Sequence, residues 1–512
     1  GNKDPTQWTK ADCYAPVASI PVVRLFTALA VSKRCTLKQG DCKNAFVQSS
    51  LPEDEVTIVR PPAGCPISAP NTYWRLRKSL YGLRRAPRHW FDLVSSHLTS
   101  PEVGLRQCKN DPCVFVGSPV PGKPPLYLII YVDDFLYFSE DPEVERYFEN
   151  AFAQKITVDY IGNAEFFLGI KFDWNITPTS VDCRLSQEAY ANTIIDELGL
   201  SSANTNPHST PYRAGFPIDT IPHVDMSLED RQPLITRVRS LLGMLNWLCI
   251  CTRPDLTTCV SLLAQYQCTP SPGHLDAIKY LGRYLKSSTD LGIVYSSSGN
   301  KTLDSFVHFP VPVNDSNGSP IPLVCCDANW GPQDASSRTT HPSLFAREIS
   351  LMETRSICGH VLFLASGPVL WKCHREQRTS RSSCEAEVKA TDECTKSIQM
   401  FRHLLSEIGG FDLSKPTPIL NDNQGAVDWC KTTSTKGMRH VNIRENCVRE
   451  AVHEFHEVQI FHIPGKHNPS DIFTKEHKDV TTFLTLLDTL LRRSPSLQLL
   501  ANDILSRMDG GC

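Results

Sequence analysis

The chain of 512 residues is too long for one hydrophobic core and predicts about three or four domains. Its hydrophobic content of 41% and charged content of 21% are typical of a folded protein and exclude a largely disordered or fibrous class. No apolar run of about eighteen residues, the length that a membrane span needs, is present, so we expect no membrane association. The net charge of −3 does not by itself predict a nucleic-acid-binding protein, although such proteins can concentrate positive charge locally.

The segment up to about residue 200 alternates short apolar strands with helices. Helical periodicity covers 22–32 and 88–99, and a strand is predicted at 36–41. Residues 73–90 carry six basic side chains and no acid, with aromatic residues between them. This mixture suits contacts to phosphates and stacking on bases, although a solvated basic face would have the same pattern.

Two adjacent carboxylates follow a strongly apolar run. The sequence Tyr-Val-Asp-Asp at 131–134 lies between two such runs and predicts a tight β-hairpin with the acids at its tip. Buried carboxylates are costly unless a cation lies beside them, and a divalent metal is a common partner. Asp133 and Asp134 need a third acid to hold two metal ions, and Asp41, at the end of its predicted strand, is the candidate. An ordinary Asp-Asp turn is the alternative.

The rest of the chain divides by composition. Residues 204–222 are rich in Pro, Thr, Ser and Asn and predict a linker, 228–291 have helical periodicity, and 296–322 are rich in loop-forming residues. Beyond them, apolar strand-like runs and helical patterns alternate, which predicts an α/β domain of about 160 residues. The expected strands are 323–327, 357–364, 369–372, 417–420 and 458–462, and the expected helices are 382–408, 424–432 and 442–454.

A second set of acids lies at strand ends and helix starts of this C-terminal part. The four are Asp327, Glu387, Asp422 and Asp471. If the α/β sheet brings them together, they could hold two metal ions that activate water against a phosphodiester. Four unrelated surface acids are the alternative, because the residues are far apart in sequence.

Several motifs occur in the order and spacing of one polymerase family. The clearest are 38–47, the sequence Ser-Leu-Tyr-Gly-Leu-Arg-Arg-Ala-Pro-Arg-His-Trp at 79–90, and Tyr-Val-Asp-Asp at 131–134. Together they resemble the motifs of Ty1/copia-type retrotransposon reverse transcriptases, part of a Pol polyprotein. Further matching segments follow in the same order at 167–169, 185–190, 239–243, 252–255 and 280–290.

The resemblance implies roles around the first acid set. Asp41 and Asp133 would be the main ligands of two Mg²⁺ ions, with Asp134 beside them and Mn²⁺ as an alternative ion. Phe46, five residues after Asp41, would exclude a ribose 2′-hydroxyl, although a plain core aromatic is the alternative.

The resemblance also implies contacts to substrates. Tyr81 and Gly82 occupy positions that line the pocket for the incoming nucleotide. Contacts to template, primer or phosphates are implied for Arg84, Arg85, Arg88, Phe167, Leu168 and Gly169.

Motifs of the C-terminal part resemble the ribonuclease H domain of the same elements. They are 326–330, 382–387, 421–424 and 471–475. The resemblance implies that the second acid set is a catalytic site for two further Mg²⁺ ions. Glu387 is preferred over Glu385 because the Val-Lys-Ala after it fits the family pattern. His467 matches a mobile histidine that helps product release, and a surface histidine is the alternative.

The implied fold is a multidomain α/β protein in which a right-hand polymerase, with fingers, palm and thumb, precedes a ribonuclease H-like α/β domain. Few residues precede the Tyr-Ala-Pro-Val sequence at 14–17, so we expect incomplete fingers, and 334–354 looks like an insertion. The expected segments are fingers and palm at 1–205, a helical thumb or connecting region at 206–300, a linker at 301–321, the ribonuclease H domain at 322–478 and a tail at 479–512.

The resemblance further implies an enzyme that copies RNA into DNA and degrades the RNA of the hybrid. Its partners would be an RNA template, a DNA or tRNA primer, deoxynucleoside triphosphates and an RNA/DNA hybrid, with an integrase from the same polyprotein as a further partner. The expected location is intracellular, in a cytoplasmic virus-like particle or the nucleus. Two alternatives remain, namely a host-adopted nucleic-acid-binding protein and a nuclease with an impaired polymerase.

Overall fold

The chain forms a mixed α/β structure of two compact units. The computed structural model describes residues 8–66, 71–202, 204–213, 218, 221–222, 224–299, 301–306, 320–331, 355–433, 446–477 and 479–493. One unit comprises Gly1–Phe26, Arg34–Ala164 and Leu404–Gly409, and the other comprises Thr27–Lys33, Glu165–His403 and Gly410–Cys512. The expected multidomain α/β character is confirmed. The five expected segments stay a prediction, and the expected insertion at 334–354 lies outside the described residues.

The first unit is built on an antiparallel sheet of six strands in the order β4-β5-β6-β7-β1-β8. Its central strands β6 and β7 are continuous apolar runs buried on both faces, as expected where both sides of a sheet are covered. The ring of Phe135 on β7 packs edge-on against Phe152 of α5, with centroids 5.5 Å apart. The strands are β1 (Lys38–Cys42), β4 (Arg106–Gln107), β5 (Val114–Gly117), β6 (Leu126–Tyr131), β7 (Asp134–Ser139) and β8 (Val158–Asn163).

Short elements and helices complete the N-terminal part of the chain. A small hairpin pairs β2 with β3. The expected helices at 22–32 and 88–99 correspond to α2 and α4. The bounds are α1 (Lys10–Cys13), α2 (Ile20–Ser32), α3 (Ala45–Gln48), β2 (Ile58–Val59), β3 (Trp74–Arg75), α4 (Ala86–Leu98) and α5 (Pro142–Ala153).

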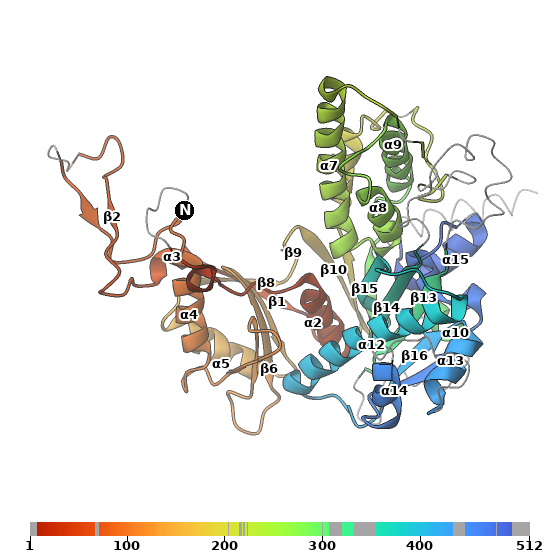
Figure 1. The fold of residues 1–512 in the computed structure, drawn as a ribbon. Coiled ribbons are helices and arrows are strands. Elements are labelled where there is room, and N and C mark those ends of the chain that lie inside the picture. The colour runs from red at the N-terminus through yellow and green to blue at the C-terminus, as the bar shows by residue number, and fades with distance from the viewer. Residues whose placement is uncertain are drawn as a thin grey trace, which may run out of the picture. The chain divides into compact units, whose positions relative to one another are not determined.

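The second unit begins with a four-stranded antiparallel sheet and a group of helices. The sheet has the order β12-β11-β10-β9, so a strand near residue 295 pairs with one near residue 185. The helices α7, α8 and α9 pack against one another (Figure 1). The bounds are β9 (Phe166–Phe167), β10 (Ile170–Ile176), β11 (Val181–Ser186), α6 (Glu188–Glu197), α7 (Leu228–Cys251), η2 (Pro254–Leu256), α8 (Thr257–Ala264), α9 (Pro272–Lys286) and β12 (Ile293–Ser296).

The helix α7 is the one described helix that is long and apolar enough to cross a membrane, by length and composition alone. Its buried side chains recur at helical spacing, with Val238, Leu241, Leu242 and Leu245 on one stripe. This stripe packs in the unit, where α7 contacts α8 and η2. The arrangement is that of an amphipathic core helix.

A five-stranded sheet forms the rest of the second unit, in the order β15-β14-β13-β16-β17. The first three strands are antiparallel, whereas β13, β16 and β17 run parallel. The predictions of strands at 357–364 and 458–462 are confirmed with the same bounds. The elements are β13 (Leu323–Asn329), β14 (Ile357–Leu364), β15 (Gly367–Arg375), α12 (Ser383–Ile408), β16 (Thr417–Asn421), α13 (Gln424–Lys431), α14 (Asn446–His453), β17 (Val458–His462), η5 (Gly465–His467) and η6 (Pro469–Phe473).

Two helices lie in segments for which the sequence predicted no regular structure. In the expected linker, α10 (Lys301–Phe306) buries Leu303 and Phe306. In the expected tail, Asp479 is the N-cap of α15 (Val480–Leu490). Its carboxylate accepts hydrogen bonds from the backbone N–H groups of Thr481 and Thr482. Buried apolar side chains hold both helices, so the described part of the tail belongs to the packed core of the second unit.

We expect Phe483→Ala to lower the free energy of unfolding by about 3–5 kcal/mol, the usual cost of removing a buried phenyl ring. Phe483 is fully buried in α15, and its ring packs edge-on against Tyr284, with centroids 5.9 Å apart. Denaturant unfolding of the full chain measures the change. Leu484→Ala is the matched control, because Leu484 is 47% exposed on the same helix. Equal effects of the two substitutions would contradict the packing of α15.

Candidate active sites

The tip of the β6–β7 hairpin has a strained backbone. Val132 adopts a φ of 59°, which is unfavourable for a β-branched residue. Two hydrogen bonds from neighbouring elements hold the turn: the indole N–H of Trp90 donates to the Val132 carbonyl at 2.5 Å, and the Cys42 N–H donates to the Asp133 carbonyl at 2.8 Å. Trp90 ends the 79–90 motif, so this motif has a direct role in positioning the acids.

The three predicted acids of the first set converge at this tip. Asp41 on β1 lies opposite Asp134 on β7 in the strand register. Burial raises the pKa of Asp41, and the Asp133 carboxylate is the next largest cause. Burial also raises the pKa of Asp134, followed by the charges of Asp133 and Asp41, while a hydrogen bond with Gln39 opposes the shift. These mutual charge effects show that the three carboxylates lie near one another, and carboxylate oxygens are ligands that Mg²⁺ prefers.

Predicted nucleotide-binding residues lie beside these acids. The rings of Phe46 on α3 and Tyr81 are 4.7 Å apart between centroids. Burial and then the charges of Asp133 and Asp41 raise the pKa of Tyr81. Phe46 is half-buried. Gly82 has a φ of 98°, a conformation that favours glycine.

Two of the predicted nucleic-acid-binding arginines are paired with acids of the chain itself. The Arg85 guanidinium lies 2.7 Å from the Glu55 carboxylate, and Arg88 lies 2.8 Å from Asp92 one turn along α4. Arg84 is exposed. Contacts of Arg85 or Arg88 to a phosphate would therefore need these ion pairs to be shared or exchanged.

The predicted primer-contacting segment forms the turn between β9 and β10 in the second unit. Leu168 and Gly169 have φ values of 53° and 74°, as in the tight turns favoured by hairpins. Phe167 is buried, whereas its neighbour Phe166 is 59% exposed. The two rings face opposite sides, as alternation along a strand requires.

Three acids of the second set form one cluster in the second unit. Asp327 lies on β13, Asp422 directly follows the adjacent parallel strand β16, and Asp471 lies in η6. A ligand oxygen from each lies within 4.8 Å of the others. Burial raises the pKa of both Asp422 and Asp471, and the charge of Asp327 raises them further. The cluster has the oxygen donors and charge that fit a divalent cation.

Glu387 lies near this cluster, in the first turns of α12. It is buried, and burial followed by the charges of Asp327 and Asp422 raises its pKa. The Asn421 side-chain amide donates to its carboxylate at 3.0 Å. Glu385 instead pairs with Lys389 at 2.9 Å, so the two glutamates face different surroundings as the helical geometry requires.

A close approach between η6 and the sheet sets the position of Asp471. Gly359 on β14 lies opposite Asp327 in the strand register. A Cβ atom on Gly359 would lie only 2.5 Å from the Cβ of Phe473. Glycine at this position therefore lets η6 lie against the strand pair that carries Asp327.

Lys475 also belongs to this cluster, although the sequence did not predict it as a site residue. Its ammonium nitrogen lies 2.7 Å from Asp471 and 3.3 Å from Asp327. Its position four residues after Asp471 could have predicted this contact, because a lysine at i+4 can contact an acid at i within one helical turn.

His467, the predicted product-release residue, lies in η5. Its ring stacks on Phe306 of α10, with centroids 4.8 Å apart and planes 8° from parallel. The same turn approaches the cluster, because a Cβ on Gly465 would lie 3.0 Å from an Asp422 carboxylate oxygen. A mobile role for His467 would require this stack to open.

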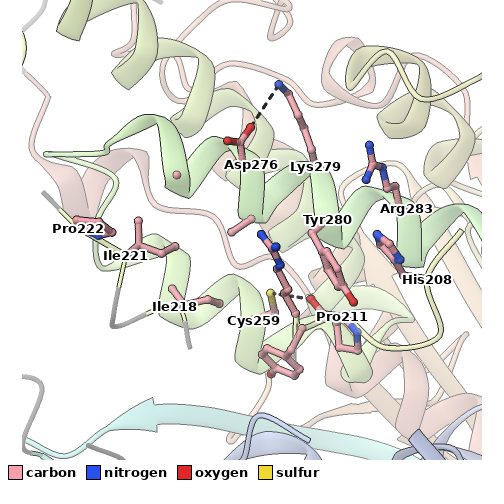
Figure 2. Close-up of a pocket in the computed structure, with 14 residues that line it drawn as sticks. His208, Pro211, Ile218, Ile221, Pro222, Cys259, Asp276, Lys279, Tyr280 and Arg283 are labelled. Carbon is pink, nitrogen blue, oxygen red and sulfur yellow. Dashed lines mark hydrogen bonds and ion pairs between the residues drawn. The ribbon is translucent and has the colours of Figure 1, made fainter. Parts of the chain in front are cut away.

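A separate cavity of about 680 Å³ lies among the helices of the second unit. Figure 2 shows Tyr280 of α9 beside His208, and their ring centroids are 3.9 Å apart. Lys279 and Asp276 form an ion pair of 3.6 Å on the same helix. None of the seven predicted acids lines this cavity, so it is not part of either acid cluster.

The chain is similar to known proteins over its N-terminal segment and beyond it. Residues 4–214 match the family described as "Reverse transcriptase (RNA-dependent DNA polymerase)". Similarity to curated proteins extends further along the chain. The Pol polyprotein from transposon RE2 of Arabidopsis thaliana is 27% identical over 466 residues, or 91% of this chain, and that from transposon TNT 1-94 of Nicotiana tabacum is 24% identical over 465 residues.

A more distant relative is the Gag-Pol polyprotein of transposon Ty1-ER2 from Saccharomyces cerevisiae, 21% identical over 88% of this chain. The chain spans about 28% of the length of the RE2 protein and 23% of the Ty1-ER2 protein. Among solved structures, a foamy viral protease-reverse transcriptase in complex with double-stranded DNA aligns over 83% of this chain and 58% of its own length, with 11% identity and a TM-score of 0.17.

Proposed function

We propose, from the match of residues 4–214 to the reverse transcriptase family and the similarity to Pol polyproteins of transposons, that this chain copies RNA, and then DNA, into DNA and cleaves the RNA of the resulting hybrid. The observation that supports polymerisation most is the convergence of Asp41, Asp133 and Asp134 next to the ring pair of Phe46 and Tyr81. The observation that supports hybrid cleavage is the cluster of Asp327, Asp422 and Asp471.

In polymerisation, the residues at the hairpin tip bind and orient. The carboxylates of Asp41 and Asp133 would hold two Mg²⁺ ions, or Mn²⁺, which would supply activation of the primer 3′-oxygen and charge stabilisation at the triphosphate. Trp90 keeps the tip in its strained turn and thereby keeps the acids together. Phe46 and Tyr81 would place the sugar of a deoxynucleotide and exclude a 2′-hydroxyl.

In hybrid cleavage, the second acid set would hold metal ions of the same kind against the scissile phosphate of the RNA strand. Asp327, Asp422 and Asp471 form the cluster. Glu387 lies close enough to interact electrostatically with Asp327 and Asp422. Asn421 orients the Glu387 carboxylate by its hydrogen bond. His467 would act at product release if its stack on Phe306 opens.

The proposed partners are an RNA template, a DNA or tRNA primer, deoxynucleoside triphosphates and an RNA/DNA hybrid. An integrase from the same polyprotein and an intracellular location, in a virus-like particle or the nucleus, belong to the same proposal. A host-adopted binding protein is less consistent with the acids, because a protein that only binds gains nothing from like charges held together.

Primer extension on an RNA template and cleavage of an RNA/DNA hybrid, measured side by side with the same preparation, test the proposal. We expect both activities in Mg²⁺ and neither in EDTA. A binding protein would retain hybrid binding without either reaction. A nuclease with an impaired polymerase would cleave the hybrid but not extend the primer.

We expect Phe46→Ala to reduce selection of deoxynucleotides over ribonucleotides by roughly tenfold to a hundredfold, as a steric block at the sugar would be removed. The measurement is single-nucleotide incorporation with each substrate. Val47→Ala, the next residue on α3, is the control and should leave selection unchanged. Unchanged selection in Phe46→Ala would show that Phe46 is a packing residue.

A further inference from the structure

The ammonium group of Lys475 lies among the three acids of the C-terminal cluster. Its nitrogen is 2.7 Å from Asp471 Oδ1, 3.3 Å from Asp327 Oδ1 and 3.9 Å from Asp422 Oδ2. Thr474, the preceding residue, donates a hydrogen bond from its hydroxyl to the other oxygen of Asp327. The cluster therefore already contains one internal cation, contributed by the segment that carries Asp471.

The three carboxylates around the Lys475 ammonium are shielded from solvent, so its charge stabilises them in the metal-free protein. The Asp327 side chain is 1% exposed, and those of Asp471 and Asp422 are 11% and 16% exposed. Carboxylates this close and this shielded repel one another strongly unless a positive charge lies between them. Lys475 supplies that charge, and its presence opposes the upward shift in the pKa of Asp422 and Asp471.

The position of Lys475 is set by the local backbone. Its N–H donates to the Asp471 carbonyl at 2.9 Å, so the segment from Asp471 to Lys475 closes one helical turn. This turn directs the side chain back over the acids. The side chain is nevertheless 37% exposed, and a lysine stem is flexible, so the ammonium has a route to solvent.

A divalent ion and this ammonium need the same carboxylates. A Mg²⁺ ion held by these residues would bind oxygens that Lys475 now contacts, and its charge would repel the ammonium. Resting on the hybrid-cleavage function proposed above, we propose that Lys475 is an exchangeable internal counter-ion, which keeps the metal-free acids together and which a divalent ion displaces.

Mn²⁺ binding tests this competition directly. The parent protein and all its variants carry Asp133→Asn, which weakens metal binding by the N-terminal acids. Electron paramagnetic resonance measures the concentration of free Mn²⁺. We expect Lys475→Met to bind Mn²⁺ roughly tenfold more tightly than its parent, within the usual range of coupling between two competing ligands. Its melting temperature in EDTA should fall, and the rise on adding Mn²⁺ should be larger than in the parent.

Two further variants serve as controls. Lys475→Arg keeps the charge and should bind Mn²⁺ nearly as the parent does. Lys466→Met removes an exposed lysine close in sequence and should change neither affinity nor melting temperature. Equal or weaker Mn²⁺ binding by Lys475→Met overturns the inference, because the ammonium would then not compete with the ion.

A measurement on the unaltered lysine covers the case in which Lys475→Met does not fold. An acetylating reagent and mass spectrometry report the reactivity of each lysine without and with Mg²⁺. We expect acetylation of Lys475 to rise several-fold with Mg²⁺, with Lys466 as the unchanged internal reference, and no rise would overturn the inference. If Asp422→Asn binds Mn²⁺ as the parent does, the proposed nuclease site itself fails, and the inference fails with it.

Discussion

We expect that replacing Asp133 by Asn abolishes primer extension and leaves hybrid cleavage unchanged. Asn has nearly the same size but lacks the charge that a metal ion requires, and Asp133 is the acid whose charge most raises the pKa of Asp41. Loss of a metal ligand should lower the extension rate by about a thousandfold or more, which corresponds to roughly 4 kcal/mol of transition-state stabilisation. Extension of a labelled primer over a range of enzyme concentrations has the dynamic range to measure this loss.

The matched control is Glu143→Gln, which also removes one negative charge from the first unit. Glu143 lies at the start of α5, where it is exposed and forms a surface ion pair with Lys123 at 3.0 Å. This variant should retain extension, because surface ion pairs contribute little. If Asp133→Asn extends the primer normally, the hairpin acids are not the polymerase site. If it loses cleavage as well, the substitution has disturbed more than one site.

The second large effect is expected from Asp422→Asn, which should abolish hybrid cleavage and spare primer extension. Asp422 shares a cluster with Asp327 and Asp471, and a ligand oxygen of each lies within 4.8 Å of the others. Removing one of three acids should reduce metal binding, with a fall in cleavage again of about a thousandfold. The assay is release of labelled RNA fragments from a defined hybrid.

Although Asp422→Asn should abolish cleavage, it should not lower the free energy of unfolding of the metal-free chain. Burial and the charge of Asp327 raise the pKa of Asp422, so its ionised form is disfavoured in the folded chain. Without metal, Asn at this position should therefore leave the chain as stable as before, or more stable. Asp428→Asn, on the exposed face of α13, is the control and should retain cleavage. Loss of cleavage in both variants would count against the assignment of Asp422.

Local sequence patterns were sufficient to predict helices and strands whose apolar residues recur with a regular spacing. The strands at 357–364 and 458–462 have the predicted bounds, because the first is a mostly apolar run and the second begins with buried apolar residues at alternate positions. Helix α15 was missed because its apolar stripe is short and packs on a core that the local sequence does not describe. The pairing of β11 with β12 was missed because these strands are distant in the chain and their partner choice depends on the whole sheet.

The sequence by itself determined the motifs that resemble those of reverse transcriptases and the inventory of acids. The Tyr-Val-Asp-Asp hairpin and the motif at 79–90 are short and locally folded, so their residue types alone identify them. The sequence also places Asp327 and Asp422 near the ends of predicted strands, where a sheet can bring acids together.

Only the tertiary structure decided which of those acids meet and what lies between them. Asp327 and Asp422 meet because β13 pairs in parallel with β16, and Asp471 joins them because Gly359 admits η6 against β14. Strand order and register are set by packing over the whole domain, and a period-two pattern does not encode them. The same packing places the Lys475 ammonium beside Asp327 and Asp422, which are distant in the sequence, as well as beside Asp471 four residues before it.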